Sequence, residues 1–258
     1  MRLLEYNMGE GIRAFSTTRE GGVGIETYAG FNITHYCGDN PEAVVQNRAF
    51  LCAELAISDN RLLLPHQTHG CEVLCIDETF LALSPEEQTA LLYGKDAVVT
   101  DISRLCIGVS TADCVPVLLY DAVKGVVAAV HAGWRGTVAR IVEKVLETMQ
   151  ERYGCSLADV KAVIGPSISL NAFEVGDEVY DTFALAQFPM EKIARKYCNK
   201  WHIDLWEANR LQLLACGVSA DAVEVCGVCT FARFREFFSA RRLGINSGRI
   251  FSGIIKIK

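Results

Sequence analysis

The stretch Thr111–His131, TADCVPVLLYDAVKGVVAAVH, decides the fold because it places two apolar runs on either side of a polar turn. Val115–Tyr120 and Val126–Val130 are short, β-branched and apolar, which predicts two strands. Asp121–Gly125 lies between them and has the composition of a turn. The stretch therefore predicts an antiparallel hairpin, buried enough to form the centre of a sheet.

The same hairpin brings two potential metal ligands together at its open end. If the hairpin is centred between Ala122 and Val123, Cys114 lies directly opposite His131. Directly opposed residues of an antiparallel pair have Cβ atoms about 4.5–5.5 Å apart. A zinc ion that binds sulfur at ~2.3 Å and nitrogen at ~2.0 Å would fit between such side chains. This register predicts two ligands of a metal site.

A third ligand is expected from the segment PHQTHG at 65–70, which precedes another predicted strand. His69 is the better candidate of its two histidines, because Gly70 lets the backbone approach closely and re-aims the preceding side chain. Two histidines and one thiolate leave a fourth position open, which is typical of catalytic zinc. His66 would instead close the site with a fourth ligand, so a structural metal site or partner-binding module is an alternative.

A second cysteine pattern, Cys226-Gly-Val-Cys229, is a competing metal or redox signal. It lies on a predicted strand, no second pair follows at zinc-ribbon spacing, and no βαβ unit surrounds it. We interpret these two residues as buried thiols.

A candidate anion site directly follows His131. The glycine-rich segment Gly133–Thr137 leads into a helix predicted over Thr137–Tyr153, and the first amides of a helix attract anions. Arg135 would add a bidentate donor and is a candidate catalytic residue. Asp113, beside Cys114, is the other catalytic candidate, either as a general acid or base or as a residue that orients a ligand. The residues expected to bind substrate or anion are Arg19, Asn32, Arg48, Gly133, Arg135, Gly136 and Arg241.

The rest of the chain predicts strands and helices without regular alternation. Further strands are expected at Arg13–Arg19, Glu72–Ile76, Ala97–Thr100, Cys106–Val109, Val160–Ile164, Val223–Val228 and Ile250–Ile257. Further helices are expected from Asn40-Pro41 onward, around Asp177–Ala186 and at Leu205–Ala215. This order favours an α+β fold, a single domain over residues 1–258 with mixed, mostly antiparallel sheets flanked by helices. Neither of the two common nucleotide-binding glycine motifs is present in the sequence.

Composition excludes several classes of partner. The net charge is −6, so we expect no nucleic-acid partner. No apolar run approaches the ~20 residues of a membrane helix, and the N-terminus lacks the apolar core of a signal peptide. Eleven cysteines in a chain of 258 residues fit reduced thiols better than disulfides. We expect a monomeric cytoplasmic protein without membrane contacts.

Three motifs resemble the signature blocks of the bacterial YfiH/YlmD family, which is described as laccase-domain polyphenol oxidases, purine nucleoside phosphorylases and peptidoglycan editing factors. They are Gln67-Thr-His69-Gly70, Thr111-Ala-Asp113-Cys114-Val-Pro-Val and His131-Ala-Gly-Trp-Arg-Gly-Thr137. Supporting blocks keep the family's order along the chain, namely Phe15–Gly22, Gly38-Asp39, Asn47-Arg48, Ile164–Ile168, Phe173–Gly176, Asp204–Arg210 and Phe237–Arg242. Two positions depart from the pattern. Ser167 replaces a cysteine found in some relatives, so no nucleophile is assigned there, and Ser110 stands where arginine is frequent.

The resemblance implies a zinc ion held by His69, Cys114 and His131, with copper able to occupy the same site. It also implies small-molecule partners: phosphate and the purine nucleosides adenosine, inosine and methylthioadenosine, with deamination of adenosine as a second activity. A zinc hydrolase that edits L-Ser-containing peptidoglycan precursors would use the same site. A copper-dependent polyphenol oxidase is a further alternative, although five histidines are too few for a multicopper centre.

Overall fold

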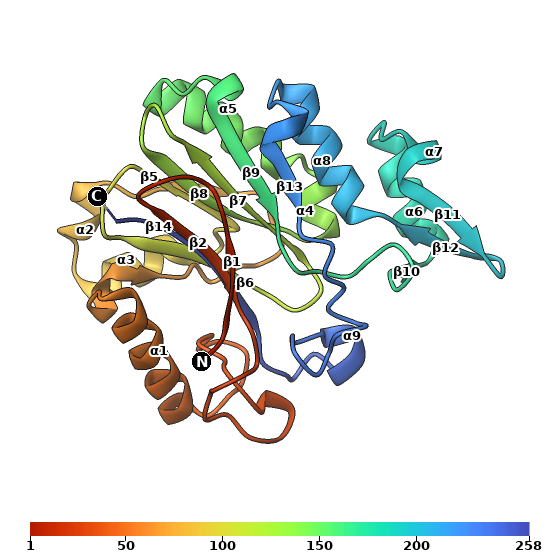
Figure 1. Cartoon of the computed structure of the whole chain (residues 1–258). Coiled ribbons are helices and arrows are strands. Elements are labelled where there is room, and N and C mark those ends of the chain that lie inside the picture. Colours follow the sequence, from red (N-terminus) through yellow and green to blue (C-terminus); the bar gives the residue numbers. More distant parts are fainter. Residues whose placement is uncertain (258) are drawn as a thin grey trace.

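Two large β-sheets lie face to face at the centre of the molecule (Figure 1). The computed structural model describes residues 1–257. The five-stranded sheet has the order β1 (Leu3–Tyr6), β2 (Ile12–Thr17), β14 (Ile250–Lys256), β6 (Cys106–Thr111), β3 (Leu62–Leu63). The six-stranded sheet has the order β13 (Val223–Val225), β9 (Val160–Ile164), β7 (Val115–Asp121), β8 (Val126–Ala132), β5 (Ala97–Thr100), β4 (Val73–Cys75).

Helices cover the outer faces of both sheets and complete four layers. Figure 1 shows α5 (Ile141–Tyr153) and α8 (Leu205–Cys216) on one side and α1 (Pro41–Leu55) on the other. Val145 and Leu213 pack with the six-stranded sheet, and Leu51 packs with the five-stranded sheet. Because each large sheet is buried on both faces, all residues of β7 and β8 are buried, which explains their unbroken apolar sequence.

A small sheet and short helices extend this framework at the side seen on the right in Figure 1. The small sheet contains β10 (Glu174–Val175), β12 (Lys200–Ile203) and β11 (Ala194–Tyr197). The short helices beside this sheet are α6 (Asp177–Leu185) and α7 (Met190–Ile193), and the other short α-helices of the described residues are α2 (Glu78–Leu81), α3 (Pro85–Leu92), α4 (Trp134–Val138) and α9 (Ala240–Leu243). Short 3₁₀ turns occupy Glu26–Tyr28, Asp59–Arg61, Leu157–Asp159 and Ala220–Ala222.

The predicted fold class is confirmed. The two large sheets are mixed and mostly antiparallel, since only the short edge strands β3, β4 and β13 run parallel to their neighbours. The predicted helix at Asn40-Pro41 is also confirmed, because the Asn40 side chain accepts a hydrogen bond from the amide of Glu42 and Pro41 is the first helical residue.

The predicted hairpin register is wrong by two residues. His131 pairs with Pro116, not with Cys114, and the ladder closes at Asp121 and Val126. The Asp121 carboxylate accepts hydrogen bonds from the amides of Val123 and Lys124, which fixes a four-residue loop over 122–125. Cys114 therefore lies just outside the ladder.

The helix predicted over Thr137–Tyr153 is divided into two. Arg140 has φ 61°, which ends α4 and starts α5 in a new direction. Its guanidinium donates to Glu143 and to the carbonyl of Ala186 and lies over the Phe188 ring, so contacts with later segments stabilise the break.

All eleven cysteines are free thiols. Cys226 and Cys229 are half-buried, so the expectation that both are buried is wrong. Cys229 accepts hydrogen bonds from the amide and hydroxyl of Ser169. Among residues 1–257, no helix has the length and apolarity that crossing a membrane would require.

Candidate metal centre

His69, Cys114 and His131 form a cluster at one end of the six-stranded sheet. One ligand atom from each residue lies within 4.8 Å of the others. His131 is buried near the end of β8, Cys114 directly precedes β7, and His69 is exposed in the loop before β4. The three ligands predicted from the sequence are therefore close together.

Gly133 explains how Cys114 meets the histidines although the predicted register is wrong. Continuing the observed ladder beyond Val115 and Ala132 puts Cys114 opposite Gly133, and His131 is on the same face of β8 as Gly133. A Cβ atom at Gly133 would lie 3.1 Å from Cys114 Sγ, 3.5 Å from His69 Cδ2 and 3.7 Å from His131 Cε1. The missing side chain leaves the space in which the three ligands converge.

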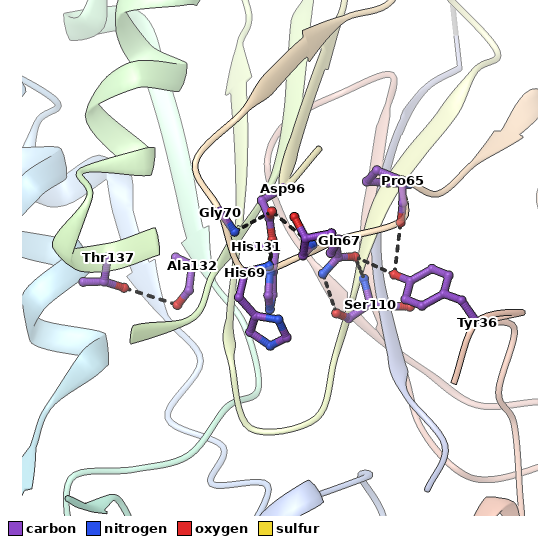
Figure 2. Close-up of polar contacts among 11 residues, drawn as sticks. Tyr36, Pro65, Gln67, His69, Gly70, Asp96, Ser110, His131, Ala132 and Thr137 are labelled. Atoms are coloured by element: carbon purple, nitrogen blue, oxygen red, sulfur yellow. Dashed lines mark hydrogen bonds and ion pairs between the residues drawn. The ribbon is translucent and has the colours of Figure 1, made fainter. Parts of the chain in front are cut away.

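Asp96 holds two of the ligands in place, as Figure 2 shows. Its carboxylate lies 2.7 Å from His131 Nδ1 and accepts hydrogen bonds from the amides of Thr68, His69 and Gly70. These amides fix a loop in which His69 has φ 62°, a left-handed conformation that is uncommon for residues other than glycine. Because Nδ1 faces Asp96, Nε2 of His131 is left for a metal.

The sequence analysis missed Asp96. A usable signal existed, because Asp96 directly precedes the predicted strand Ala97–Thr100. In the structure Ala97 pairs with Val130, so Asp96 is the next residue along and faces His131. Recognising it required the pairing of β5 with β8, which the sequence analysis did not derive.

The cluster shifts the proton affinities of its members. Burial alone would lower the pKa of His131, but the Cys114 sulfur and the Asp96 carboxylate outweigh it and raise that pKa to about 9. Burial would raise the pKa of Cys114, but the two histidines lower it to about 6. For Asp96, burial is opposed by His131 and the loop amides, which hold its pKa below the usual value. The site thus favours a thiolate, the form that binds metals.

The donor set fits one zinc ion. Donors ~2.0–2.3 Å from a single ion lie within about 4.6 Å of one another, close to the spacing of this cluster. Two imidazoles and a thiolate suit zinc and also copper. Among residues 1–257 no other group of three or more histidine, cysteine or carboxylate side chains has this spacing.

Two cavities flank the cluster. The larger, of about 510 Å³, has aromatic and aliphatic walls that include Trp134, Phe173 and Leu205. The smaller, of about 260 Å³, has polar walls that include Gln67, Thr111 and Arg249. His69 and Cys114 line both cavities, so a metal held by them would be reached from both sides.

Asp113 lies in the wall of the larger cavity. Its carboxylate accepts hydrogen bonds from the hydroxyl of Thr230 at 2.6 Å and from the amide of Arg241 at 2.7 Å. Asp113 also has φ 86°, which turns the chain between β6 and Cys114. Both oxygens of this candidate catalytic residue are thus used to hold neighbouring segments beside the cavity.

The other predicted binding residues are dispersed. Arg135 is exposed, its guanidinium lies 4.2 Å from the Trp134 ring centre, and it lines neither cavity, so the anion site expected at Gly133–Thr137 stays a prediction. Arg241 lines the larger cavity. Gly133 and Gly136 provide close packing, against Cys114 and the carbonyl of Gly70 respectively.

Arg19, Asn32 and Arg48 lie outside both cavities. The Arg19 guanidinium donates to the carbonyls of Ala29 and Phe234. Asn32 is buried and bonds to Asp39 and to the amide of Thr34, while Arg48 bonds to Asp59 and the carbonyl of Leu62. These contacts stabilise turns and do not converge on one anion.

His66 is not in the metal cluster. Its ring stacks on Tyr36 with a centroid distance of 4.2 Å and lines the smaller cavity. A closed site with His66 as the fourth protein ligand is therefore not what the structure shows for residues 1–257.

Comparisons with known proteins agree with this architecture. Residues 13–257 match the family described as multi-copper polyphenol oxidoreductase laccase. A protein of Bacteroides thetaiotaomicron named purine nucleoside phosphorylase is 49% identical over 95% of this chain and 91% of its own. A protein of an unknown prokaryote, named adenosine deaminase RL5, is 47% identical over 96% of this chain and 95% of its own. The crystal structure of YlmD from Geobacillus stearothermophilus superimposes with a TM-score of 0.91 at 30% identity, covering 98% of this chain and 94% of that one.

Proposed function

This chain belongs to the multi-copper polyphenol oxidoreductase laccase family, and from that premise we propose that it is a zinc-dependent purine nucleoside phosphorylase with adenosine deaminase activity. The carrying observation is the open three-ligand cluster between an apolar and a polar cavity. His69, Cys114 and His131 would hold the zinc, which would supply Lewis-acid chemistry at that point. Adenosine, inosine and methylthioadenosine are the proposed nucleosides.

The larger cavity supports binding of a purine. Trp134 and Phe173 offer aromatic surface, and Ile168 and Leu205 add apolar walls. In phosphorolysis the bond between ribose C1′ and the base breaks, its electron pair leaves with the base, a phosphate oxygen bonds to C1′, and the proton that phosphate releases neutralises the base. In deamination, water adds at C6 of adenine and ammonia leaves. In both reactions, polar groups react beside the flat face of a purine ring. The larger cavity could hold that ring against its apolar walls, and the smaller cavity could hold the polar groups.

Asp113 has a positioning role in this proposal. Its two oxygens hold Thr230 and the amide of Arg241, which keeps the Arg241 segment against the larger cavity. Arg135 lies outside both cavities, so the proposal gives it no part in the reaction.

A single-metal polyphenol oxidase is the second candidate, favoured by the family's description. Copper would use the same three ligands. A multicopper centre needs several ligand groups, whereas residues 1–257 contain one such cluster. The nucleoside proposal is preferred because two relatives, each aligned over more than nine-tenths of its length, are named for reactions of purine nucleosides, one a phosphorylase and one an adenosine deaminase.

The experiment that tests the proposal is a product assay on metal-quantified protein, supplied with adenosine in the presence and absence of phosphate. Mass spectrometry should find adenine and ribose 1-phosphate only when phosphate is present, and inosine in both reactions. Absence of turnover by protein with stoichiometric zinc would overturn the proposal and favour the peptidoglycan-editing hydrolase. Copper-loaded protein assayed with a phenol tests the oxidase in parallel.

Three further properties belong to the proposal. The family match from 13 to 257 supports one domain over residues 1–258. Eleven free thiols support a cytoplasmic location. A metal cluster and two cavities built from one chain support a monomeric enzyme.

A further inference from the structure

We propose that the smaller cavity is the phosphate site and that Thr111 and Arg249 are its specific donors. This inference rests on the proposed function and refines it, because the sequence analysis placed the phosphate at Gly133–Thr137 and Arg135. Neither Thr111 nor Arg249 belongs to that earlier set, and both line the smaller cavity.

Thr111 carries an unsatisfied hydroxyl. The residue is 1% exposed, and its Oγ1 has no hydrogen-bond partner among residues 1–257. Leaving a buried hydroxyl without a partner costs free energy, so such groups in native proteins call for an explanation. Thr111 is one of the residues that line the smaller cavity, and we assign a phosphate oxygen bound there as the acceptor of its hydroxyl.

Arg249 keeps part of its guanidinium available. Nη1 donates to the carbonyls of Ser247 and Gly248, and Nη2 donates to the carbonyl of Ile245. A guanidinium has five N–H donors, so Nε–H and one Nη2–H have no acceptor among residues 1–257. Two free donors on one guanidinium suit a bidentate contact with phosphate.

The charges around the smaller cavity favour an anion. No aspartate or glutamate is among its lining residues, Arg249 is a lining cation, and the Cys114 thiolate, which lines both cavities, would be bound to the metal. The larger cavity has one carboxylate, Asp113, together with Arg241. A divalent metal at His69, Cys114 and His131 would add positive charge beside the smaller cavity. An oxyanion is therefore better accommodated there than in the larger cavity.

Hydrogen bonds connect several residues in the wall of the smaller cavity. Gln67 donates to the carbonyl of Ser110 and accepts from the amide of Ser110, and Tyr36 donates to the carbonyl of Pro65 (Figure 2). Gln67 is buried, so its amide is fixed on both sides. This network holds the strand end that carries Thr111 in one position.

The arrangement also satisfies the stereochemical need of the reaction. Direct displacement at C1′ requires phosphate to approach from the face opposite the departing base. The base site and the phosphate site must therefore lie on two sides of the ribose. The two cavities meet at His69, Cys114, Ala112, Ala240 and Ile245, which line both. A ribose at this junction would have the base in the apolar cavity and phosphate in the polar one.

The decisive variant is Thr111→Val. It preserves shape and removes a hydroxyl that has no partner within the protein, so the fold should be unaffected. We expect inorganic phosphate to bind zinc-loaded protein saturated with adenine at least about tenfold more weakly after this change, by isothermal titration calorimetry. The KM for phosphate should rise by a similar factor, while the KM for inosine changes little.

Arg249→Gln should weaken phosphate binding further, and Arg242→Gln is the matched control. Arg242 is exposed, lies over Phe231 and Phe234 and lines neither cavity, so its variant should bind phosphate like the parent protein. Because Arg249 also holds the loop from Gly244 to Gly248, thermal unfolding is measured for each variant. The inference stands on Thr111→Val if Arg249→Gln is unstable.

The outcomes separate this inference from the proposed function. Weaker phosphate binding in Thr111→Val supports the site even if the parent protein forms no ribose 1-phosphate. Phosphorolysis with an unchanged phosphate KM in both Thr111→Val and Arg249→Gln overturns the site and leaves the phosphorylase proposal intact. Failure of inorganic phosphate to bind the zinc-loaded parent protein also overturns it.

Discussion

The metal cluster joins a strand region and a loop region that are held in different ways. His131 lies in β8, whose residues are all buried and paired on both sides with β7 and β5. His69 and Cys114 lie in loops with left-handed backbone, at His69 itself and at Asp113 before Cys114. The strand ligand takes its position from the sheet, whereas the loop ligands need dedicated contacts.

Asp96 supplies those contacts for the His69 loop and connects it to the strand. One carboxylate orients the His131 ring and accepts the amides of the His69 loop. The comparison shows that the rigid sheet alone does not define the site. The buried carboxylate of Asp96, just before β5, fixes the loop that carries His69 relative to the strand that carries His131.

Removing a ligand should have the largest effect. We expect His131→Ala and Cys114→Ala to lose stoichiometric zinc and, with it, both proposed activities, since two remaining protein ligands hold zinc poorly. Metal analysis of the purified variants and the product assay with adenosine check this. A folded variant that keeps full turnover would contradict the role of the cluster.

His66→Ala is the control for ligand removal. His66 lies outside the metal cluster, so this variant should retain one zinc per chain. Loss of zinc from His66→Ala would instead support a closed four-ligand site and the structural alternative.

Asp96→Asn should have the next largest effect and would break the link between strand and loop. An amide cannot serve as acceptor for all of His131 and three backbone amides, because half of its polar capacity donates. We expect zinc affinity to fall about 10–100-fold, and the free energy of unfolding to fall by up to about 3 kcal/mol. Competition with a chelator and denaturant titration measure the two quantities.

Asp59→Asn is the matched substitution for that experiment. Asp59 is exposed and pairs with Arg48 at the surface, where an ion pair contributes about 0–1 kcal/mol. An equal loss of zinc affinity in both variants would show that Asp96 has no special role in orienting the ligands.

The sequence predicted the fold class and all three clustered ligands because both depend on local patterns. Unbroken apolar runs identify β7 and β8 whatever strands they pair with, and Cys114 and His131 lie at the open end of the one hairpin that these strands form. The exact register could not be predicted, since it depends on how the Asp121 carboxylate caps the turn amides. The error was harmless because Gly133 leaves room for Cys114 to reach the histidines.

The supporting residues were missed because they depend on contacts distant in sequence. Asp96 meets His131 across 35 positions, and Arg249 reaches the smaller cavity from the loop before the last strand. At Arg135 the local pattern predicted an anion site, and that prediction is not tested by the five-residue helix and the contact with Trp134.

Gly133→Ala should have a smaller effect, and it tests whether the space at Gly133 is needed for the three metal ligands to meet. Gly133 has φ −63°, which alanine also adopts, so the metal-free fold should be preserved. The new Cβ would lie 3.1 Å from Cys114 Sγ, tighter than ordinary contact, and should displace the thiolate slightly. We expect zinc affinity to fall several-fold, up to about tenfold, with little change in unfolding temperature. Unchanged zinc affinity would mean that the Cys114 loop can shift to accept the added methyl group, which would contradict the expectation that Gly133 is required there.

Ala56→Gly should have the smallest effect. Ala56 and His69 both have left-handed backbone, but only His69 belongs to the metal site, so the two positions can be compared. Ala56 caps α1 with φ 52°, close to the φ 62° of His69, and glycine adopts this conformation without the steric cost of a Cβ atom. We expect Ala56→Gly to raise the free energy of unfolding by about 0.5–1 kcal/mol and leave zinc affinity unchanged. His69→Gly would relieve the same conformation but remove a ligand, so zinc should be lost. Thermal unfolding and zinc titration of the two variants separate these effects. If Ala56→Gly also weakened zinc binding, α1 and the metal centre would be coupled and the contrast between the two strained positions would fail.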